Sequence, residues 1–203
     1  MMRRSQAIYA FLLLALPILY WFYQQPSNAQ SSEDLRACIA EFEKIRVEAA
    51  KIKPVNLFPF LQGYQQLGYR DKKGEVIIPP RFTEARNFSQ GRAVVADRDW
   101  YKGFINSKGE LIIPHKFVWV SDFSKGIAVF SGTKENREQK GLIDLRGNIV
   151  LTFKGASPDP EFNGFDQDGR VSVYVHDLSR GYGNPVPKIY GYVDCTGKVT
   201  LKK

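Results

Sequence analysis

The feature that most constrains this chain is a short pattern that occurs four times after residue 67. Each copy has a glycine, two mostly apolar residues, an aspartate or asparagine, two variable residues, a second glycine and then aliphatic residues. The copies begin at Gly68, Gly103, Gly141 and Gly191, so successive starts lie 35, 38 and 50 residues apart. Recurrence at such a spacing indicates one supersecondary unit used several times.

The unit predicted by this pattern is a β-hairpin. An Asx side chain three residues before a glycine favours a type I turn, in which the glycine takes a positive φ and a bulge follows. Pro79 and Pro114 are expected to end the second strand, because proline cannot donate to a sheet. The recurring Asx residues are therefore assigned to turns rather than to acid–base chemistry. The predicted turn residues are Asp71, Gly74, Asn106, Gly109, Asp144, Gly147, Asp194 and Gly197.

A second motif follows each of the first two hairpins. Phe88–Val95 matches Phe123–Phe130, and Phe165–Tyr174 is a weaker copy. A full repeat therefore reads strand, Asx–Gly turn, strand, crossover, Ser–Gly turn, strand. The predicted fold is mainly β: an array of degenerate antiparallel β-hairpin repeats over residues 55–203, preceded by one amphipathic helix. An open, solenoid-like array and a closed, propeller-like or barrel-like one both remain possible at this stage.

The two motifs in this order resemble the WG-repeat, or KWG-repeat, family over residues 63–203. Residues 68–94 match the family pattern nearly throughout, and residues 103–129 match well. The third copy lacks the proline, and the fourth stops after its hairpin. The Trp-Gly dipeptide of the family name is absent, since Leu67, Lys102, Lys140 and Tyr190 precede the four glycines. The resemblance implies a bacterial repeat fold and brings no catalytic residues with it.

Residues 1–29 have the features of an export signal. Arg3 and Arg4 precede the uncharged, apolar stretch Ala7–Tyr23, and Ser27 and Ala29 have the spacing of a signal-peptidase site before Gln30. An uncleaved single-pass anchor is the alternative, because the apolar stretch is almost long enough to span a bilayer. Both alternatives predict export to the periplasm or the cell exterior, with membrane contact only through this segment if it is uncleaved.

Residues 30–54 predict the amphipathic helix. Ser31 and Ser32 are candidate N-caps, and Pro54 follows the expected end. Its polar face mixes acids and bases, so the helix is expected to cover one end of the β domain; a partner-binding or membrane-surface helix is the alternative. The apolar face consists of Leu35, Cys38, Ile39, Phe42, Ile45, Ala49 and Ile52.

Charge and composition narrow the possible partners. The formal net charge is +8, but the basic residues are spread along the chain with acidic residues among them, which does not favour nucleic-acid binding. The positions of His115 and His176 predict surface histidines, and no Cys-x-x-Cys occurs, so neither a metal site nor a cofactor is expected. The acidic cluster Asp159, Glu161, Asp166 and Asp168 fits no known calcium loop and predicts a solvated insert.

The loops between repeats are the predicted binding face. They cover residues 97–102, 131–140 and 176–190, and insertions in repeat arrays often gather on one binding surface. Exposed aromatic rings with arginine suit a protein or glycan partner. The candidate residues are Arg98, Trp100, Tyr101, Arg180, Tyr182 and Tyr190. These loops predict a non-catalytic scaffold of the cell envelope; the alternatives are a hydrolase of envelope polymers that uses His176, and a purely structural envelope protein.

The two cysteines raise the question of how the array ends. Cys38 lies on the apolar face of the predicted helix and Cys195 in the last turn, so an oxidising compartment would allow a disulfide between them. Alternatively, Cys38 is a small buried hydrophobic residue. The apolar segment Leu57–Leu61 has no hairpin of its own, and the last hairpin has no third strand. Because an unpaired sheet edge is a liability, the N-terminal region is expected to pack near the last hairpin.

Overall fold

The fold is known from a computed structural model of the chain. It describes residues 32–64, 66–154, 156–158, 166, 170–175, 189–195 and 197–201. The chain divides into two compact units, residues 1–34 and residues 35–203, and all the described strands belong to the second. The predicted export signal lies outside the described residues. Within them, no helix is both long enough and apolar enough to cross a membrane.

The predicted helix is present as α2 (Ser32–Ala50). It ends earlier than the predicted boundary before Pro54, and the residues from Ile52 to Leu57 are extended or irregular. Ala49 is buried, and the four apolar residues on the same face that precede it are half-buried: Cys38, Ile39, Phe42 and Ile45. The exposed residues of the helix form the ion pairs Glu41–Lys44 and Glu43–Arg46, as expected for an amphipathic helix.

The rest of the described chain is β structure, which confirms the predicted mainly β fold. Antiparallel strands form a three-stranded, a seven-stranded and a four-stranded sheet. Their orders are β1-β2-β3, β10-β9-β8-β7-β6-β5-β4 and β11-β12-β13-β14. The strands are β1 (Phe58–Gln62), β2 (Gln66–Arg70), β3 (Val76–Phe82), β4 (Glu84–Ala85), β5 (Ala93–Ala96), β6 (Lys102–Ile105), β7 (Leu111–Val120), β8 (Ile127–Thr133), β9 (Lys140–Asp144), β10 (Ile149–Phe153), β11 (Ala156–Pro158), β12 (Arg170–Val175), β13 (Ile189–Asp194) and β14 (Val199–Leu201).

The hydrogen-bonded pairs of strands cross the boundaries between the sequence repeats. The last strand of each repeat pairs with the first strand of the next: β5 with β6, β8 with β9, and β12 with β13. The four-stranded sheet therefore takes β11 and β12 from the third repeat and β13 and β14 from the fourth. Strand β7 is long enough to pair with β6 through its first part and with β8 through its second. Neighbouring repeats are thus joined by main-chain hydrogen bonds.

The prediction that proline ends the second strand is wrong. Strand β3 continues through Pro79 and Pro80, and β7 continues through Pro114. The register explains why the prolines are tolerated: Tyr69 pairs with Ile78 but Leu67 pairs with Phe82, so β3 carries extra residues in an irregular stretch. A bulged residue need not donate to the neighbouring strand, and proline fits there.

The glycine that opens each repeat is required by this irregular stretch. A Cβ on Gly103 would lie 2.5 Å from the carbonyl oxygen of Ile113 and 2.9 Å from the amide nitrogen of His115. A Cβ on Gly68 would collide in the same way with the carbonyl oxygen of Ile78 and lie 2.7 Å from the nitrogen of Pro80. Only glycine lets the two backbones come this close.

The Asx–Gly turns have the geometry that their spacing predicts. Gly74, Gly109, Gly147 and Gly197 have φ values of 86°, 82°, 86° and 85°. In the first turn, Oδ1 of Asp71 accepts hydrogen bonds from the amides of Lys73 and Glu75, at 2.8 and 2.9 Å. Asn106 and Asp144 make the same pair of bonds in their turns. The side chain holds the turn, and the glycine accepts the left-handed conformation.

Each turn after the first packs on the preceding repeat. A Cβ on Gly109 would lie 3.1 Å from the side chain of Ile78, and a Cβ on Gly147 would lie 2.9 Å from Ile113. Gly197 lies in the same way against β10. Arg81 adds a hydrogen bond of 2.6 Å from Nη2 to the carbonyl of Gly109. Stacking of one repeat on the next therefore uses the turn as well as the strand edge.

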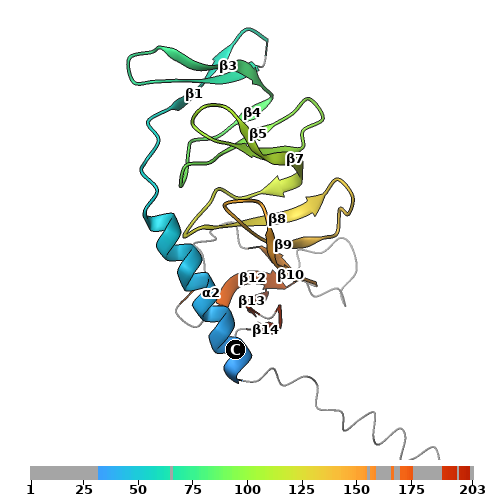
Figure 1. Cartoon of the computed structure of the whole chain (residues 1–203). Helices are drawn as coiled ribbons and strands as arrows, with labels where there is room; N and C mark the ends of the chain where they lie inside the picture. The colour runs from blue at the N-terminus through green and yellow to red at the C-terminus, as the bar shows by residue number, and fades with distance from the viewer. Residues whose placement is uncertain are drawn as a thin grey trace, which may run out of the picture. The chain divides into compact units, whose positions relative to one another are not determined.

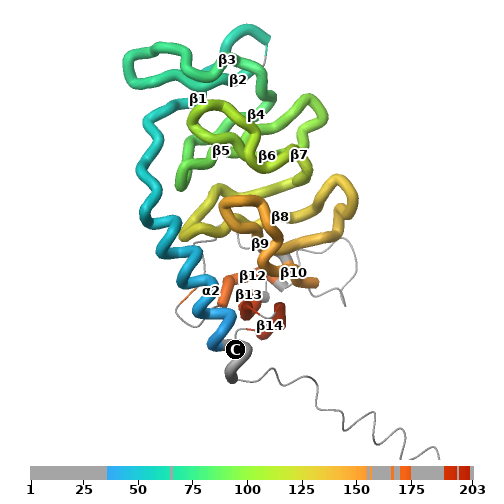
Figure 2. The backbone as a smooth tube through the Cα atoms, viewed as in Figure 1, coloured from blue at the N-terminus to red at the C-terminus, as the bar shows by residue number. Residues whose placement is uncertain are grey.

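Helix α2 lies along the array and contacts several repeats, so the expectation that it covers one end is wrong (Figure 1). Near its start, Cys38 lies beside Cys195 of the fourth repeat, with the two Cα atoms 6.2 Å apart. Further along, Ile45 and Ala49 lie against Gly126 of the second repeat, and Ile52 lies against Gly91 of the first. The helix and the segment that follows it thus pass the repeats in the reverse of their order in the sequence, as the tube in Figure 2 also shows.

The predicted closure of the array is only partly present. The helix does lie beside the last hairpin, but the apolar segment 58–62 forms β1 and pairs with β2 in the first repeat. It takes the place of the third strand that a preceding repeat would supply. In turn, β12 supplies the third strand of the last hairpin. Over the described residues, each sheet has two different end strands, so no sheet closes on itself as a barrel.

Candidate functional site

The candidate site is built on residues 97–101, between β5 and β6, which we call the aromatic loop. It is a further Asx turn: the amide of Trp100 donates to the carbonyl of Asp97 at 3.1 Å. Oδ1 of Asp97 accepts from the amides of Asp99 and Tyr101, at 3.0 and 2.9 Å. These are the bonds that Asp71 makes in the first hairpin. The loop therefore repeats the hairpin turn with one change, since Trp100 stands where the other turns have glycine.

Trp100 has an unusual backbone conformation for its size. Its φ is 64°, and 58% of its surface is exposed. A bulky residue in the left-handed region is a conformational outlier that costs of order 1–3 kcal/mol. The residue is exposed, and it belongs to none of the buried hydrophobic clusters of the described chain. Strain of this kind is concentrated at functional sites.

The second inter-repeat loop lies against the aromatic loop. Nζ of Lys134 lies 4.6 Å from the ring centre of Tyr101, which is a cation–π contact. Nη2 of Arg137 lies 3.5 Å from the hydroxyl of Tyr101. Lys102 also contacts the aromatic loop, because its Nζ donates a hydrogen bond of 3.1 Å to the carbonyl oxygen of Trp100. The structure thus brings two of the three predicted binding loops together.

Sequence reasoning missed Lys134 and Arg137 as members of the site. Both lie in the predicted loop 131–140, but their contacts with Tyr101 depend on how the repeats stack, which one sequence does not reveal. The strain at Trp100 could have been found from the sequence. Asp97 and Trp100 have the same spacing as Asp71 and Gly74, so the comparison of turns alone predicts a left-handed tryptophan.

A pocket of about 310 Å³ lies between the first two repeats, next to the aromatic loop. Its volume is at the lower end of the range for ligand pockets, roughly 300–1,000 Å³. Asp97 and Arg98 of the aromatic loop form part of its wall. The other lining residues are Arg81, Phe82, Ile105, Gly109, Leu111 and His115.

His115 is not the surface histidine that its position in the pattern predicts. The residue is half-buried, and its Nε2 is buried without a hydrogen-bond partner among the described residues. Burial lowers the pKa of the imidazole; nearby Asp97 opposes this shift, and Lys134 adds to it. The neutral ring is therefore favoured near pH 7. The sequence misled because Pro80, at the same position of the first repeat, carries no polar group to bury.

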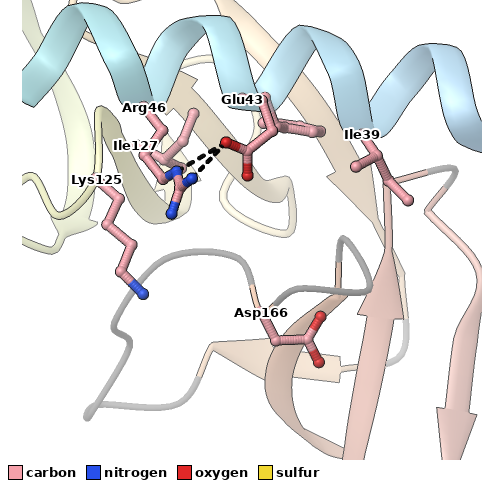
Figure 3. A pocket seen from close by; sticks show the side chains of 7 residues that line it. Ile39, Glu43, Arg46, Lys125, Ile127 and Asp166 are labelled. Atoms are coloured by element: carbon pink, nitrogen blue, oxygen red, sulfur yellow. Dashed lines mark hydrogen bonds and ion pairs between the residues drawn. The ribbon is translucent and has the colours of Figure 1, made fainter.

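A second, smaller pocket lies under α2 (Figure 3). Its volume of about 20 Å³ is close to that of a single water site and too small for a ligand. Glu43 and Arg46 form an ion pair at its rim, at 2.6 Å. This pocket belongs to the packing of the helix and is not a candidate ligand site.

The other predicted site residues are not part of this cluster. Arg180, Tyr182 and His176 lie outside the described residues, as do Asp159, Glu161 and Asp168 of the acidic cluster. Tyr190 is half-exposed and its ring centre lies 4.9 Å from that of Tyr174, with no described contact to the aromatic loop. Oδ1 of Asp166 accepts a hydrogen bond from the amide of Arg170 at 2.8 Å. No group of three or more potential metal ligands occurs in the part of the chain that is described.

The structure brings the two cysteines together. Cys38 and Cys195 form a disulfide across a sequence separation of 157 residues. Their Cα separation of 6.2 Å lies within the usual range for disulfides, about 4.4–6.8 Å. The bond joins the first half of α2 to the turn between β13 and β14.

Comparison with known families agrees with this architecture. A family model described as the WG containing repeat matches residues 68–98 and 103–131. These matches cover the first two repeats and include the start of the aromatic loop. No curated protein sequence matches the chain. The recurring hairpins, the second turn motif and the two family matches make this chain a WG-repeat-containing protein.

Proposed function

We propose that this chain is an exported, non-catalytic scaffold that binds a protein or glycan of the bacterial cell envelope through the aromatic loop. Export is inferred from residues 1–29, whose charge, apolar stretch and small residues fit a signal segment. Scaffolding is inferred from the WG repeats, which stack through turns and strand edges and present loops between them.

The observation that carries the binding role is the conformation of Trp100. The Gly74 and Gly109 turns show that glycine holds this geometry, and glycine holds it without strain. The turn therefore does not require the indole, and more than half of the surface of Trp100 is exposed. Large, rigid rings at a protein surface supply much of the binding energy in protein interfaces. The contacts of Lys134 and Arg137 with Tyr101 hold the neighbouring ring in place.

The variant Trp100→Gly separates folding from binding. Removing the left-handed tryptophan should raise the free energy of unfolding by about 1 kcal/mol, because glycine accepts this φ without strain. The same change should abolish capture of the partner. The measurements are thermal unfolding, and cross-linked pull-down from envelope extract followed by mass spectrometry and glycan staining.

The matched control is Tyr64→Ala. Tyr64 is a fully exposed aromatic residue outside the aromatic loop, so its removal should leave both stability and capture unchanged. Capture of the same partner by Trp100→Gly would contradict the proposed site. Failure of the unaltered protein to capture any partner would favour the purely structural envelope protein. The hydrolase alternative depends on His176, which the structure does not describe, and is not proposed.

A further inference from the structure

The pocket between the first two repeats has an unbalanced charge. Arg81 and Arg98 are the two cationic residues that line it, and Asp97 is the one acidic residue. Oδ1 of Asp97 is already committed to the turn, where it accepts from two backbone amides. His115 adds no charge near pH 7, because burial favours its neutral form. Lys134, which influences His115 from the neighbouring loop, is also cationic. The surroundings of the pocket therefore favour an anion.

The two guanidinium groups have hydrogen-bonding capacity left over. Nη2 of Arg81 donates to the carbonyl of Gly109, and the guanidinium lies 5.1 Å from the ring centre of Phe82. One such bond uses only part of the five donors that an arginine carries. No hydrogen bond or ion pair of the exposed Arg98 side chain occurs among the described residues. Carboxylates and phosphates both match the planar fork of a guanidinium, and the carboxylate is the one that unmodified protein side chains supply.

The other lining residues and the volume of the pocket indicate what kind of group it binds. Phe82, Ile105 and Leu111 give the pocket an apolar side, which suits methylene groups next to the charge. His115 adds an imidazole to the lining, although its Nε2 is buried and has no partner among the described residues. A volume of about 310 Å³ accommodates a single side chain or a small acid. A glutamate side chain, with two methylene groups and a carboxylate, has these properties.

We propose that this pocket receives a glutamate or aspartate side chain of a partner protein, so that the partner presents an acidic peptide segment to the aromatic loop. The inference deepens the proposed function, because Arg98 of the pocket and Trp100 of the loop belong to one turn. Trp100 packs against the segment, and the guanidinium groups of Arg81 and Arg98 bind its carboxylate. The partner class is thereby narrowed from protein or glycan to an acidic protein segment.

The test uses small probes and the whole chain. Isotope-labelled protein is titrated with N-acetyl-glutamyl amide, with N-acetyl-glutaminyl amide as the neutral isostere and with glucuronate as an acidic sugar. The readouts are the chemical shifts of the Arg98 side-chain Nε–H and of the His115 ring. The glutamyl probe is expected to give saturable shifts at both groups and to bind more tightly than glucuronate. The glutaminyl probe is expected to give none.

Variants assign the binding to the pocket. Arg98→Gln is expected to raise the Kd of the glutamyl probe roughly tenfold or more, as is usual when a hydrogen bond to a charged group is lost. Arg81→Gln is a second variant, and unchanged backbone spectra elsewhere show that it folds. Arg70→Gln is the matched control, since Arg70 is an exposed arginine of β2 that does not line the pocket. It should bind the probe as the unaltered protein does.

The outcomes separate this inference from the proposed function. Equal binding of the glutamyl and glutaminyl probes, or full binding by Arg98→Gln, would overturn the acidic-side-chain pocket. Tighter binding of glucuronate would overturn it in favour of an acidic glycan. Trp100→Gly leaves the pocket residues in place, so it should still bind the glutamyl probe. If Trp100→Gly also still captured the envelope partner, the proposed function would fail while the pocket stood.

Discussion

Two different requirements of the backbone explain why certain positions in this protein must be glycine. The turn glycines, such as Gly74, are needed because φ is positive, and that requirement can be predicted from the Asx–Gly spacing. The glycines that open the repeats, such as Gly103, are needed because another strand passes too close for a Cβ. That second requirement comes from a bulge on the partner strand, so the sequence shows the recurrence without its cause.

These two requirements predict different costs for the same substitution. Gly74→Ala should lower the free energy of unfolding by about 1–2 kcal/mol, the cost of a left-handed conformation alone. Nothing lies within 4 Å of the added Cβ at that position. Gly103→Ala should cost more, roughly 3 kcal/mol, because its Cβ would overlap the backbone of β7. Denaturant unfolding of both variants compares the two, and an equal loss would contradict the close approach.

His115 predicts a dependence of stability on pH. Burial holds its pKa below the ordinary value of about 6.5, so the unfolded chain takes up a proton more readily than the folded one. The stabilisation is therefore complete above that ordinary value and is lost as the pH falls through it toward the lower folded pKa.

The variant His115→Pro, which restores the residue found at Pro80, removes this titration. Its free energy of unfolding should fall less steeply between pH 7 and pH 5 than that of the unaltered protein. The comparison concerns the slope with pH, so any constant effect of the proline on stability cancels. Identical slopes would show that the imidazole is not buried in its neutral form.

At the scale of helices and strands, the sequence predicts the secondary structure of each segment. It predicts less well which strands pair with each other. The hairpins, the helix and the second turn motif all follow from spacing and periodicity. The pairing of the last strand of one repeat with the first strand of the next does not, because the sequence repeat and the sheet are out of phase. For the same reason, β1 looked like a segment without a hairpin, whereas it supplies the third strand of the first sheet.

Helix α2 offers a direct test of its position along the repeats. Ile45 packs on the buried cluster that includes Val129 and Leu142, whereas Val47, two residues on, is about half exposed. Ile45→Ala should lower the free energy of unfolding by about 1–2 kcal/mol, a reduced cost for a half-buried site. Val47→Ala should change it by less than about 0.5 kcal/mol, as is usual at the surface. Similar losses at the two positions would contradict the packing of the helix.

For the whole molecule, the pairing of Cys38 with Cys195 predicts a large effect of reduction. Closing a loop of 157 residues stabilises by about 5 kcal/mol in the chain-entropy model, which is an upper estimate. The double variant Cys38→Ala, Cys195→Ala should therefore melt well below the oxidised protein and close to the reduced one. Thiol counting on unreduced, denatured protein should find none, and two free thiols would disprove the bond.

The route of the helix also decides how the molecule responds to force. With the disulfide formed, the covalent path between the chain's ends runs from Cys38 directly to Cys195 and bypasses all the residues between them. Tension applied between a surface that holds the N-terminal segment and an object that holds residue 203 is carried by this bond. Residues 39–194, which include the first three repeats and the aromatic loop, lie outside this covalent path. A partner bound at the aromatic loop would therefore stay bound while tension is applied to the two ends of the chain.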